Sequence, residues 1–303
     1  MWLQKYERGS IINTMQTQTV TTKSGRQYAI EQDDTLYSQR LNNNNLHYQV
    51  TNIKFGAEIC CAKGAVDTII DCGMNVGMNT VEYGTFARRV IGFEPTPEIF
   101  KLAIKNITHN TLHWDDELPY IWDWSRKITA TIETHKIGLS NQTANVKFIS
   151  HPRNRGHNHM WNGRRQTEKD MYDVQLKLLD DYAYTGVDYI KIDTEGHELP
   201  LLEGAQKTID SNRPVVQCEI VPDQCRRYDY TAEDIWHYFI QKDYRVFTRD
   251  GVERTLGIEM KHKQGGRYRL YHHGEEIKRQ MDYWFVPCEH AWIQSNPQYK
   301  LFA

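Results

Sequence analysis

Residues 66–80 read Val66-Asp67-Thr68-Ile69-Ile70-Asp71-Cys72-Gly73-Met74-Asn75-Val76-Gly77-Met78-Asn79-Thr80, and this stretch decides the fold. Its apolar, β-branched start predicts a short strand that is covered on both faces. Gly73 and Gly77 permit a sharply bent backbone that comes close to a ligand. A helix is expected next, and its free N–H groups favour a carboxylate or phosphate. Open α/β sheets bind nucleotides at such strand–turn–helix corners.

A second short apolar strand, residues 90–93, ends in Glu94 and Pro95. Glu94 lies 23 residues after Asp71, close to the offset of roughly 20 residues at which a carboxylate reaches ribose hydroxyls. The glycines follow the pattern G-x-x-x-G, whereas the dinucleotide pattern G-x-G-x-x-G is absent. The two features together favour S-adenosylmethionine (SAM) over NAD or FAD, and they disfavour a dehydrogenase.

Composition limits the other classes of protein. The chain has 303 residues, enough for one large domain or two small ones, and its net charge of −2 argues against a protein that works by wrapping nucleic acid. No apolar run approaches the length of a membrane span, and the first residues lack the apolar core of a signal peptide. The cysteines show no metal-ligand spacing, so we expect reduced thiols and an intracellular, cytoplasmic protein; they are Cys60, Cys61, Cys72, Cys218, Cys225 and Cys288.

The first 50 residues are rich in Gln, Asn and Thr. Alternation of polar and apolar residues at 27–30 and 47–50 predicts short strands. We expect an N-terminal extension that packs on the domain or supports a homo-oligomer.

The rest of the chain alternates strand and helix patterns, which predicts a parallel sheet. The further strands are expected at residues 128–132, 145–149, 187–192 and 214–220, and residues 244–247 and 283–286 are expected to close the sheet. Segments 112–126 and 249–281 read as loop insertions.

Residues 151–166 lack periodicity, which predicts another loop, and they concentrate basic and aromatic side chains. Arginine forks suit phosphate or carboxylate groups, and an indole suits the face of a sugar. Arg153, Arg155, His157 and Trp161 are therefore candidates for binding an acceptor substrate. A solvated basic loop explains the same composition, and metal binding by these histidines is disfavoured.

Ionisable residues also follow the strand at 187–192: Asp193, Glu195, His197 and Glu198. Glu219 ends the next strand. The carboxyl ends of parallel strands meet at one edge of a sheet, where open-sheet sites are built. We therefore expect these acids to face the cofactor turn.

With these stretches in hand, the sequence resembles the FkbM-type SAM-dependent methyltransferases. Residues 71–77 look like the family motif D-x-G-x-N-x-G, with Met74 where the family usually has alanine. The segments Phe93-Glu94-Pro95, Leu178-Leu179-Asp180-Asp181, Ile190–Glu198, Leu202-Glu203-Gly204-Ala205 and Phe285-Val286-Pro287 resemble the family's other signatures.

The resemblance implies a class I SAM-methyltransferase fold of α/β, Rossmann-like type. This fold has a seven-stranded, mostly parallel sheet with an antiparallel last strand and helices on both faces. The domain would span residues 56–303, after an extension over 1–55 and with insertions at 112–126, 151–170 and 249–281. It also implies methyl transfer to oxygen, often on sugars or natural products. The cofactor-binding residues would be Asp71, Gly73, Met74, Asn75, Gly77, Asn79, Thr80, Glu94, Pro95 and Gly138, with Glu94 on the ribose and Gly138 near the adenine.

The acceptor hydroxyl must be aligned with the methyl group and must lose its proton. Asp193, Glu195 and His197 are the candidates for this: His197 is the natural base near neutral pH, and Asp193 is nearer the cofactor. A variant has Asp193 and Glu219 share a Mg²⁺ ion that lowers the hydroxyl pKa. The rival functions are a nucleic-acid methyltransferase, although the D/N-P-P-Y tetrapeptide is absent, and a non-catalytic binding module of the same fold.

Overall fold

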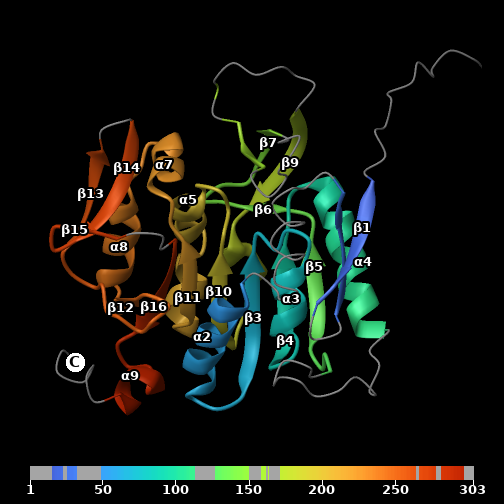
Figure 1. Cartoon of the computed structure of the whole chain (residues 1–303), viewed down its shortest axis with the longest axis horizontal. Helices are drawn as coiled ribbons and strands as arrows, with labels where there is room; N and C mark the ends of the chain where they lie inside the picture. The colour runs from blue at the N-terminus through green and yellow to red at the C-terminus, as the bar shows by residue number, and fades with distance from the viewer. Residues whose placement is uncertain are drawn as a thin grey trace, which may run out of the picture.

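The structure is a computed structural model that describes residues 16–22, 26–32, 49–112, 127–149, 158–161, 163, 171–263, 266–277 and 281–296. At its centre is a seven-stranded sheet in the order β12-β16-β11-β10-β3-β4-β5 (Figure 1). Their bounds are β12 Tyr244–Phe247, β16 Asp282–Pro287, β11 Val215–Glu219, β10 Val187–Ile192, β3 Val66–Cys72, β4 Ala87–Phe93 and β5 Thr131–His135.

Five neighbouring strands of this sheet, from β11 to β5, run parallel, and β16 is antiparallel to both β11 and β12. The expected seven-stranded, mostly parallel sheet with an antiparallel last strand is therefore confirmed. The chain winds from β3 outward through β4 to β5 and then returns to β10 and continues the other way. The reversal between β3 and β10 is the switch point at which open sheets form their ligand crevice.

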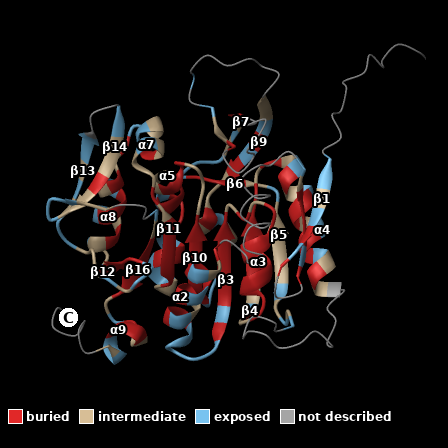
Figure 2. Ribbon diagram, in the orientation of Figure 1, coloured by how far each residue is buried: buried red, intermediate tan, exposed pale blue. Residues whose placement is uncertain are grey.

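Helices cover both faces of the sheet, as expected, because the strands alternate apolar side chains between the faces (Figure 2). Ile69 and Val90 pack with α2 (Val50–Cys61) and α9 (Ala291–Ser295) on one face. Ile70 and Ile91 pack on the other face with α5 (Glu198–Glu203), α6 (Gln206–Asn212) and α8 (Ala232–Ile240). The remaining helices are α3 (Met78–Tyr83), α4 (Pro97–Leu112), α7 (Pro222–Cys225), η3 (Leu179–Tyr182) and η4 (Arg226–Tyr228).

Three small sheets surround this core. The strands β1 (Thr17–Thr21) and β2 (Gln27–Glu31) form a hairpin. A four-stranded sheet has the order β6-β9-β7-β8 and lies above the carboxyl edge of the main sheet (Figure 1); its strands are β6 Gly138–Leu139, β7 Ala144–Ile149, β8 His159–Met160 and β9 Met171–Lys177. The third sheet consists of β13 (Ile258–Lys263), β14 (Arg267–His272) and β15 (Glu275–Glu276).

Several expectations from the sequence need correction. The strand expected at 128–132 is β5, which begins at Thr131, because the amides of Thr129 and Ala130 donate to the carbonyl oxygen of Gly84 instead. Val50, expected at the end of a strand, begins helix α2. The segment 249–281, expected as a loop, forms the sheet β13–β15.

The expected loop at 151–166 is described only at 158–161 and 163, where residues 159–160 form strand β8. Residues 113–126 of the expected insertion 112–126, and the strand expected at residues 47–48, lie outside the described residues. Among the described helices, none combines the length and the apolar character that crossing a bilayer requires.

The β1–β2 hairpin is fixed to the domain by buried polar contacts. The side chain of Asn106 in α4 accepts from the amide of Ala29 at 2.7 Å and donates to its carbonyl oxygen at 2.9 Å. Glu82 in α3 accepts from the hydroxyl of Tyr28 at 3.0 Å and pairs with Nε of Arg26 at 3.0 Å. Burial raises the pKa of Glu82, which shows that its charge depends on these partners.

We expect Arg26→Ala to destabilise the fold by about 3 kcal/mol, because it leaves the carboxylate of Glu82 buried without its cation. Urea unfolding measures the change. Thr19→Ala, at an exposed position of β1, is the matched control and should change stability by less than about 0.5 kcal/mol. Equal stabilities of the two variants would contradict the role of the pair.

Candidate cofactor and acceptor site

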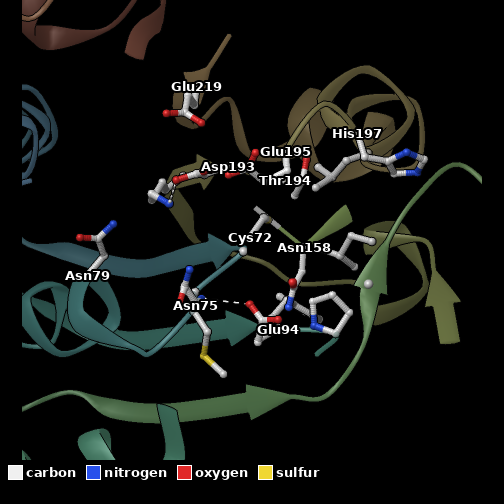
Figure 3. Close-up of a pocket in the computed structure, with 18 of the residues that line it drawn as sticks. Cys72, Asn75, Asn79, Glu94, Asn158, Asp193, Thr194, Glu195, His197 and Glu219 are labelled. Carbon is white, nitrogen blue, oxygen red and sulfur yellow. Dashed lines mark hydrogen bonds and ion pairs between the residues drawn. The ribbon is translucent and has the colours of Figure 1, made fainter. Parts of the chain in front are cut away.

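A cavity of about 530 Å³ opens at the carboxyl edge of the main sheet (Figure 3). This volume is within the range of roughly 300–1,000 Å³ typical of small-molecule sites. Its walls come from the turns after β3 and β4, from the ends of β10 and β11, from the start of α2 and from the four-stranded sheet. The cavity therefore occupies the switch point of the sheet.

The glycine turn after β3 forms the floor of the cavity. Gly73 has a φ of 82°, and a Cβ atom there would clash with the carbonyl oxygen of Asp193 at the end of β10. Gly77 has a φ of 81° and caps α3. Met74, where the resemblance leads one to expect alanine, is buried and packs over Gly92, so its larger side chain fills space in the core.

Glu94 is held rigidly at the end of β4. Its carboxylate accepts from the amide of Asn75 at 3.1 Å and from the amide of Thr96 at 2.9 Å. Burial raises the pKa of Glu94 to about 7, against the effect of these bonds. Glu94 is thus an acceptor whose charge changes near neutral pH, and it faces the cavity (Figure 3).

Of the ten residues predicted to bind the cofactor, seven line the cavity: Gly73, Met74, Asn75, Asn79, Glu94, Pro95 and Gly138. Gly77 and two buried polar residues do not line it. These two are Asp71 and Thr80, whose hydroxyl donates to the Asp71 carboxylate at 2.7 Å. Asp71 and Thr80 lie beneath the glycine turn, and their hydrogen bond stabilises its conformation.

The start of α2 contributes two lining residues that sequence reasoning missed, Gln49 and Asn52. The amide nitrogen of Asn79 donates to the side-chain oxygen of Gln49 at 2.5 Å. Oδ1 of Asn79 is buried and has no hydrogen-bond partner within the part of the chain that the structure describes, so this edge of the cavity offers an acceptor. No local motif marked Gln49 or Asn52, because the fold alone brings α2 to the cavity.

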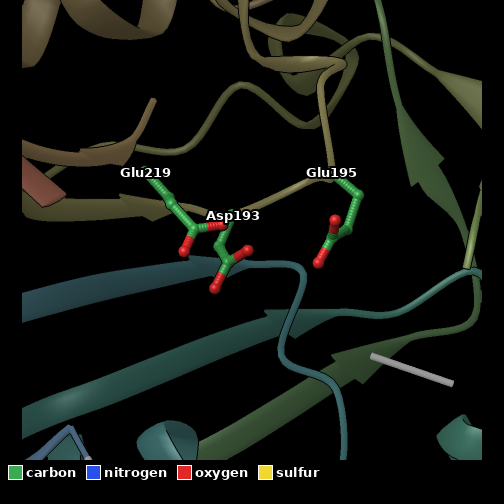
Figure 4. A group of neighbouring side chains, drawn as sticks. All are labelled: Asp193, Glu195 and Glu219. Carbon is green, nitrogen blue, oxygen red and sulfur yellow. The ribbon is translucent and has the colours of Figure 1, made fainter. Parts of the chain in front are cut away.

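Three acids meet at the ends of β10 and β11. One carboxylate oxygen from each of Asp193, Glu195 and Glu219 lies within 4.8 Å of the others (Figure 4). Nζ of Lys191 lies 3.0 Å from Asp193 and 3.8 Å from Asp71. The structure thus brings together the acids that the sequence placed at neighbouring strand ends.

The pKa values of Lys191, Glu195 and Glu219 are all raised. Burial alone would lower the pKa of Lys191, yet the charges of Asp193 and Asp71 raise it, so the lysine stays cationic. Burial and the neighbouring Asp193 raise the pKa of Glu195 to about 9 and raise that of Glu219 well above its usual range. Asp193 therefore lies beside the lysine cation, Glu195 is protonated at neutral pH, and burial favours the protonated form of Glu219.

His197 also lines the cavity, but its chemistry differs from the expectation of a base active near neutral pH. Burial lowers the pKa of His197 to about 4, so the imidazole is neutral and weakly basic. Its Nε2 atom lies 2.9 Å from Oγ of Ser140, and Nδ1 is buried with no hydrogen-bond partner among the described residues. His197 is therefore a weaker base than an exposed histidine.

Of the four residues predicted to bind the acceptor, the structure describes only Trp161. Arg153, Arg155 and His157 lie outside the described residues, and Trp161 is exposed and does not line the cavity. Asn158, three residues before Trp161, is buried and does line it.

Asp282 at the start of β16 completes the acidic end of the cavity. Its carboxylate accepts from Nδ2 of Asn52 at 2.7 Å and from Nε2 of Gln217 at 2.6 Å. Gln224 in α7 donates to Glu195 at 2.6 Å. The lining side chains of this end are therefore held in place by amides.

A doubly covered, mostly parallel sheet with a cavity at its switch point is the arrangement in which open α/β proteins bind their ligands. The chain matches the methyltransferase FkbM domain over residues 71–246, more than half of its length, and it belongs to this family. The resemblance seen in the sequence is thereby confirmed. The description of that family is a methyltransferase domain.

Solved structures with a similar arrangement include the methyltransferase FkbM from Methylobacillus flagellatus KT, with a TM-score of 0.40 and 17% identity over 72% of this chain. This chain spans 43% of that protein's length. An rRNA methylase from Streptococcus thermophilus has a TM-score of 0.36 and 13% identity, covering 78% of this chain and 92% of its own. The N-methyltransferase NodS from Bradyrhizobium japonicum WM9, in complex with S-adenosylhomocysteine, has a TM-score of 0.36 and 10% identity, covering 85% of this chain and 100% of its own. No curated protein matches the chain.

If Glu94 accepts bonds from the ribose, as the resemblance implies, binding of S-adenosylhomocysteine should weaken as the pH falls below about 7. The pKa of Glu94 is raised to about 7. Below that pH the carboxyl group must therefore lose a proton before it can accept hydrogen bonds from both ribose hydroxyl groups. Calorimetry between pH 5.5 and 8 should show affinity falling by up to about tenfold per pH unit. Glu94→Gln should bind more weakly and remove this slope; an unchanged slope in that variant would assign the pH effect to another group.

Proposed function

We propose that this protein transfers a methyl group from SAM to a hydroxyl group of a sugar, a glycan or another polyhydroxylated small molecule. The observation that carries the proposal is the contact between Lys191 and Asp193, which places a cation against one carboxyl group beside the cofactor turn. Glu195 is protonated at neutral pH and burial favours the protonated form of Glu219, so both suit hydrogen bonds to an acceptor.

The cavity fits SAM at the residues of the glycine turn. Glu94 would hold the ribose, and the free Oδ1 of Asn79 is suited to the ammonium group of the methionine part. A Cβ at Gly73 would disturb the end of β10, which explains why the turn needs glycine there. When bound, SAM supplies the electrophilic methyl group on its sulfonium.

Asp193 is the residue we assign to proton removal. The Asp193 carboxylate would take the proton of the acceptor hydroxyl, whose oxygen would bond to the methyl carbon as the carbon–sulfur bond breaks and S-adenosylhomocysteine leaves. Lys191 donates to the same carboxylate at 3.0 Å and holds it in place. Glu219 and Glu195 orient the acceptor through hydrogen bonds. Gln224 fixes Glu195, so this orientation is built into the resting protein.

The polar groups of the acceptor end support a neutral, hydroxyl-rich acceptor over a nucleic acid. Among the described residues that line this end, the cations are Lys191 and Arg249, and the other polar groups include carboxyl and amide side chains. Lys191 is already paired with acids. A phosphate backbone requires a surplus of cations, whereas hydroxyl groups pair well with carboxyl and amide groups.

The test begins with binding of SAM by calorimetry, followed by transfer of a labelled methyl group to neutral sugars, nucleotide sugars and short RNAs. We expect transfer to neutral sugars. With the acceptor found, Asp193→Asn should lower kcat by about 10²- to 10⁴-fold, because the amide cannot take the proton. Binding of S-adenosylhomocysteine by this variant should change by less than about threefold.

Asp181→Asn is the matched control, since Asp181 is exposed on η3 and away from the cavity. Transfer to RNA alone would contradict the proposed acceptor class and favour the nucleic-acid alternative. Binding of SAM with no transfer to any acceptor would favour a non-catalytic module.

A Mg²⁺ ion bound by Asp193, Glu195 and Glu219 would also offset the negative charge of these carboxyl groups, since their oxygens lie close enough to share one ion. We favour protonation of the acids over a bound ion, because the ammonium group of Lys191 is already paired with Asp193. Treatment with EDTA should therefore leave turnover within about twofold of its starting rate. Turnover that is lost with EDTA and restored by Mg²⁺ in the native chain, but not in Glu219→Gln, would assign the ion to this cluster instead.

A further inference from the structure

The end of the cavity opposite the acids has a different wall. Each strand of the four-stranded sheet, or the residue directly beside it, supplies lining residues: Gly138 and Leu139 from β6, Phe148 from β7, Asn158 before β8 and Leu176 from β9. All of these are apolar or small except Asn158. This sheet therefore builds an apolar slot with one amide in it.

The position of Glu94 decides what the slot can hold. Figure 3 shows the Asn158 side chain beside that of Glu94, and farther from Glu219 than Asp193 is. If Glu94 binds the ribose and the methyl group faces Asp193, the base must extend the other way, toward Pro95 and Gly138. Leu139, Phe148 and Leu176 then offer apolar surfaces to the faces of a purine.

We propose that Asn158 reads the adenine of the cofactor, with its side-chain oxygen accepting from the 6-amino group and its side-chain nitrogen donating to a neighbouring ring nitrogen. This inference rests on the proposed cofactor site. An asparagine amide forms this paired contact with adenine because donor and acceptor match on both sides. Asn158 has a relative exposure of 9%, so the contact would be made away from most solvent.

The assignment gives the basic segment that contains Asn158 a different role, in binding the cofactor. That segment was expected to bind the acceptor, but its described lining residue, Asn158, lies beside Glu94. The four-stranded sheet thus contributes specificity for the cofactor's base and leaves the acceptor to the ends of β10, β11 and β16.

The test compares binding of S-adenosylhomocysteine with binding of its analogue in which unsubstituted purine replaces adenine. The native protein should prefer the adenine compound by about tenfold. Asn158→Ala should weaken binding of the adenine compound by about 10- to 100-fold and reduce the preference to nearly one, because the analogue loses little in this variant. Asn158→Asp, which keeps the size of the side chain but loses the donor, should also weaken the adenine compound.

Asn145→Ala is the matched control, since Asn145 is an exposed asparagine on β7 of the same sheet. It should leave both affinities unchanged. A preference retained in both Asn158 variants would overturn the assignment while leaving the cofactor site intact. Absence of binding of either compound to the native protein would overturn the proposed function and this inference together.

Discussion

The buried ammonium group of Lys191 is the interaction on which this edge of the protein depends. It lies 3.0 Å from Asp193 and 3.8 Å from Asp71, so it joins the ends of β10 and β3, the strands between which the sheet reverses its winding. A charge at this depth is costly unless its partners are present, so the lysine and the acids stabilise one another as a set. Because Asp71 also accepts from Thr80, the same set fixes the start of α3 and the glycine turn.

The cavity beside this set has two chemically different ends. One end is acidic, with Glu195 and Glu219 beside the Lys191–Asp193 pair, and amides from α2, α7 and β11 hold it in place. The other end is apolar and belongs to the four-stranded sheet. The division suits a ligand that presents a positive, reactive centre at one end and a flat, weakly polar group at the other.

Much of this arrangement could be predicted from local patterns. The buried strand β3, the glycine turn and the acid after β4 are contiguous in sequence, and their order predicted a nucleotide site. The acids after β10 and β11 were predicted to meet because parallel strands end at one edge of a sheet. The start of β5 was misplaced, since bonds from residues 129 and 130 to Gly84 depend on a turn far away in the chain. The same limit applied to Gln49, Asn52 and Asn158, which no motif marks.

The sequence by itself determined the α/β class, the corner that bends at Gly73 and the family, because these follow from periodicity and from short runs of residues. The tertiary structure decided the charges and the partners. His197 reads as a base in sequence, yet burial makes it neutral and places it against Ser140. Asn52 and Asp282 are 230 residues apart and form one hydrogen bond at the acceptor end. Protonation depends on burial and on neighbours in space, and a linear pattern contains neither until the chain has folded.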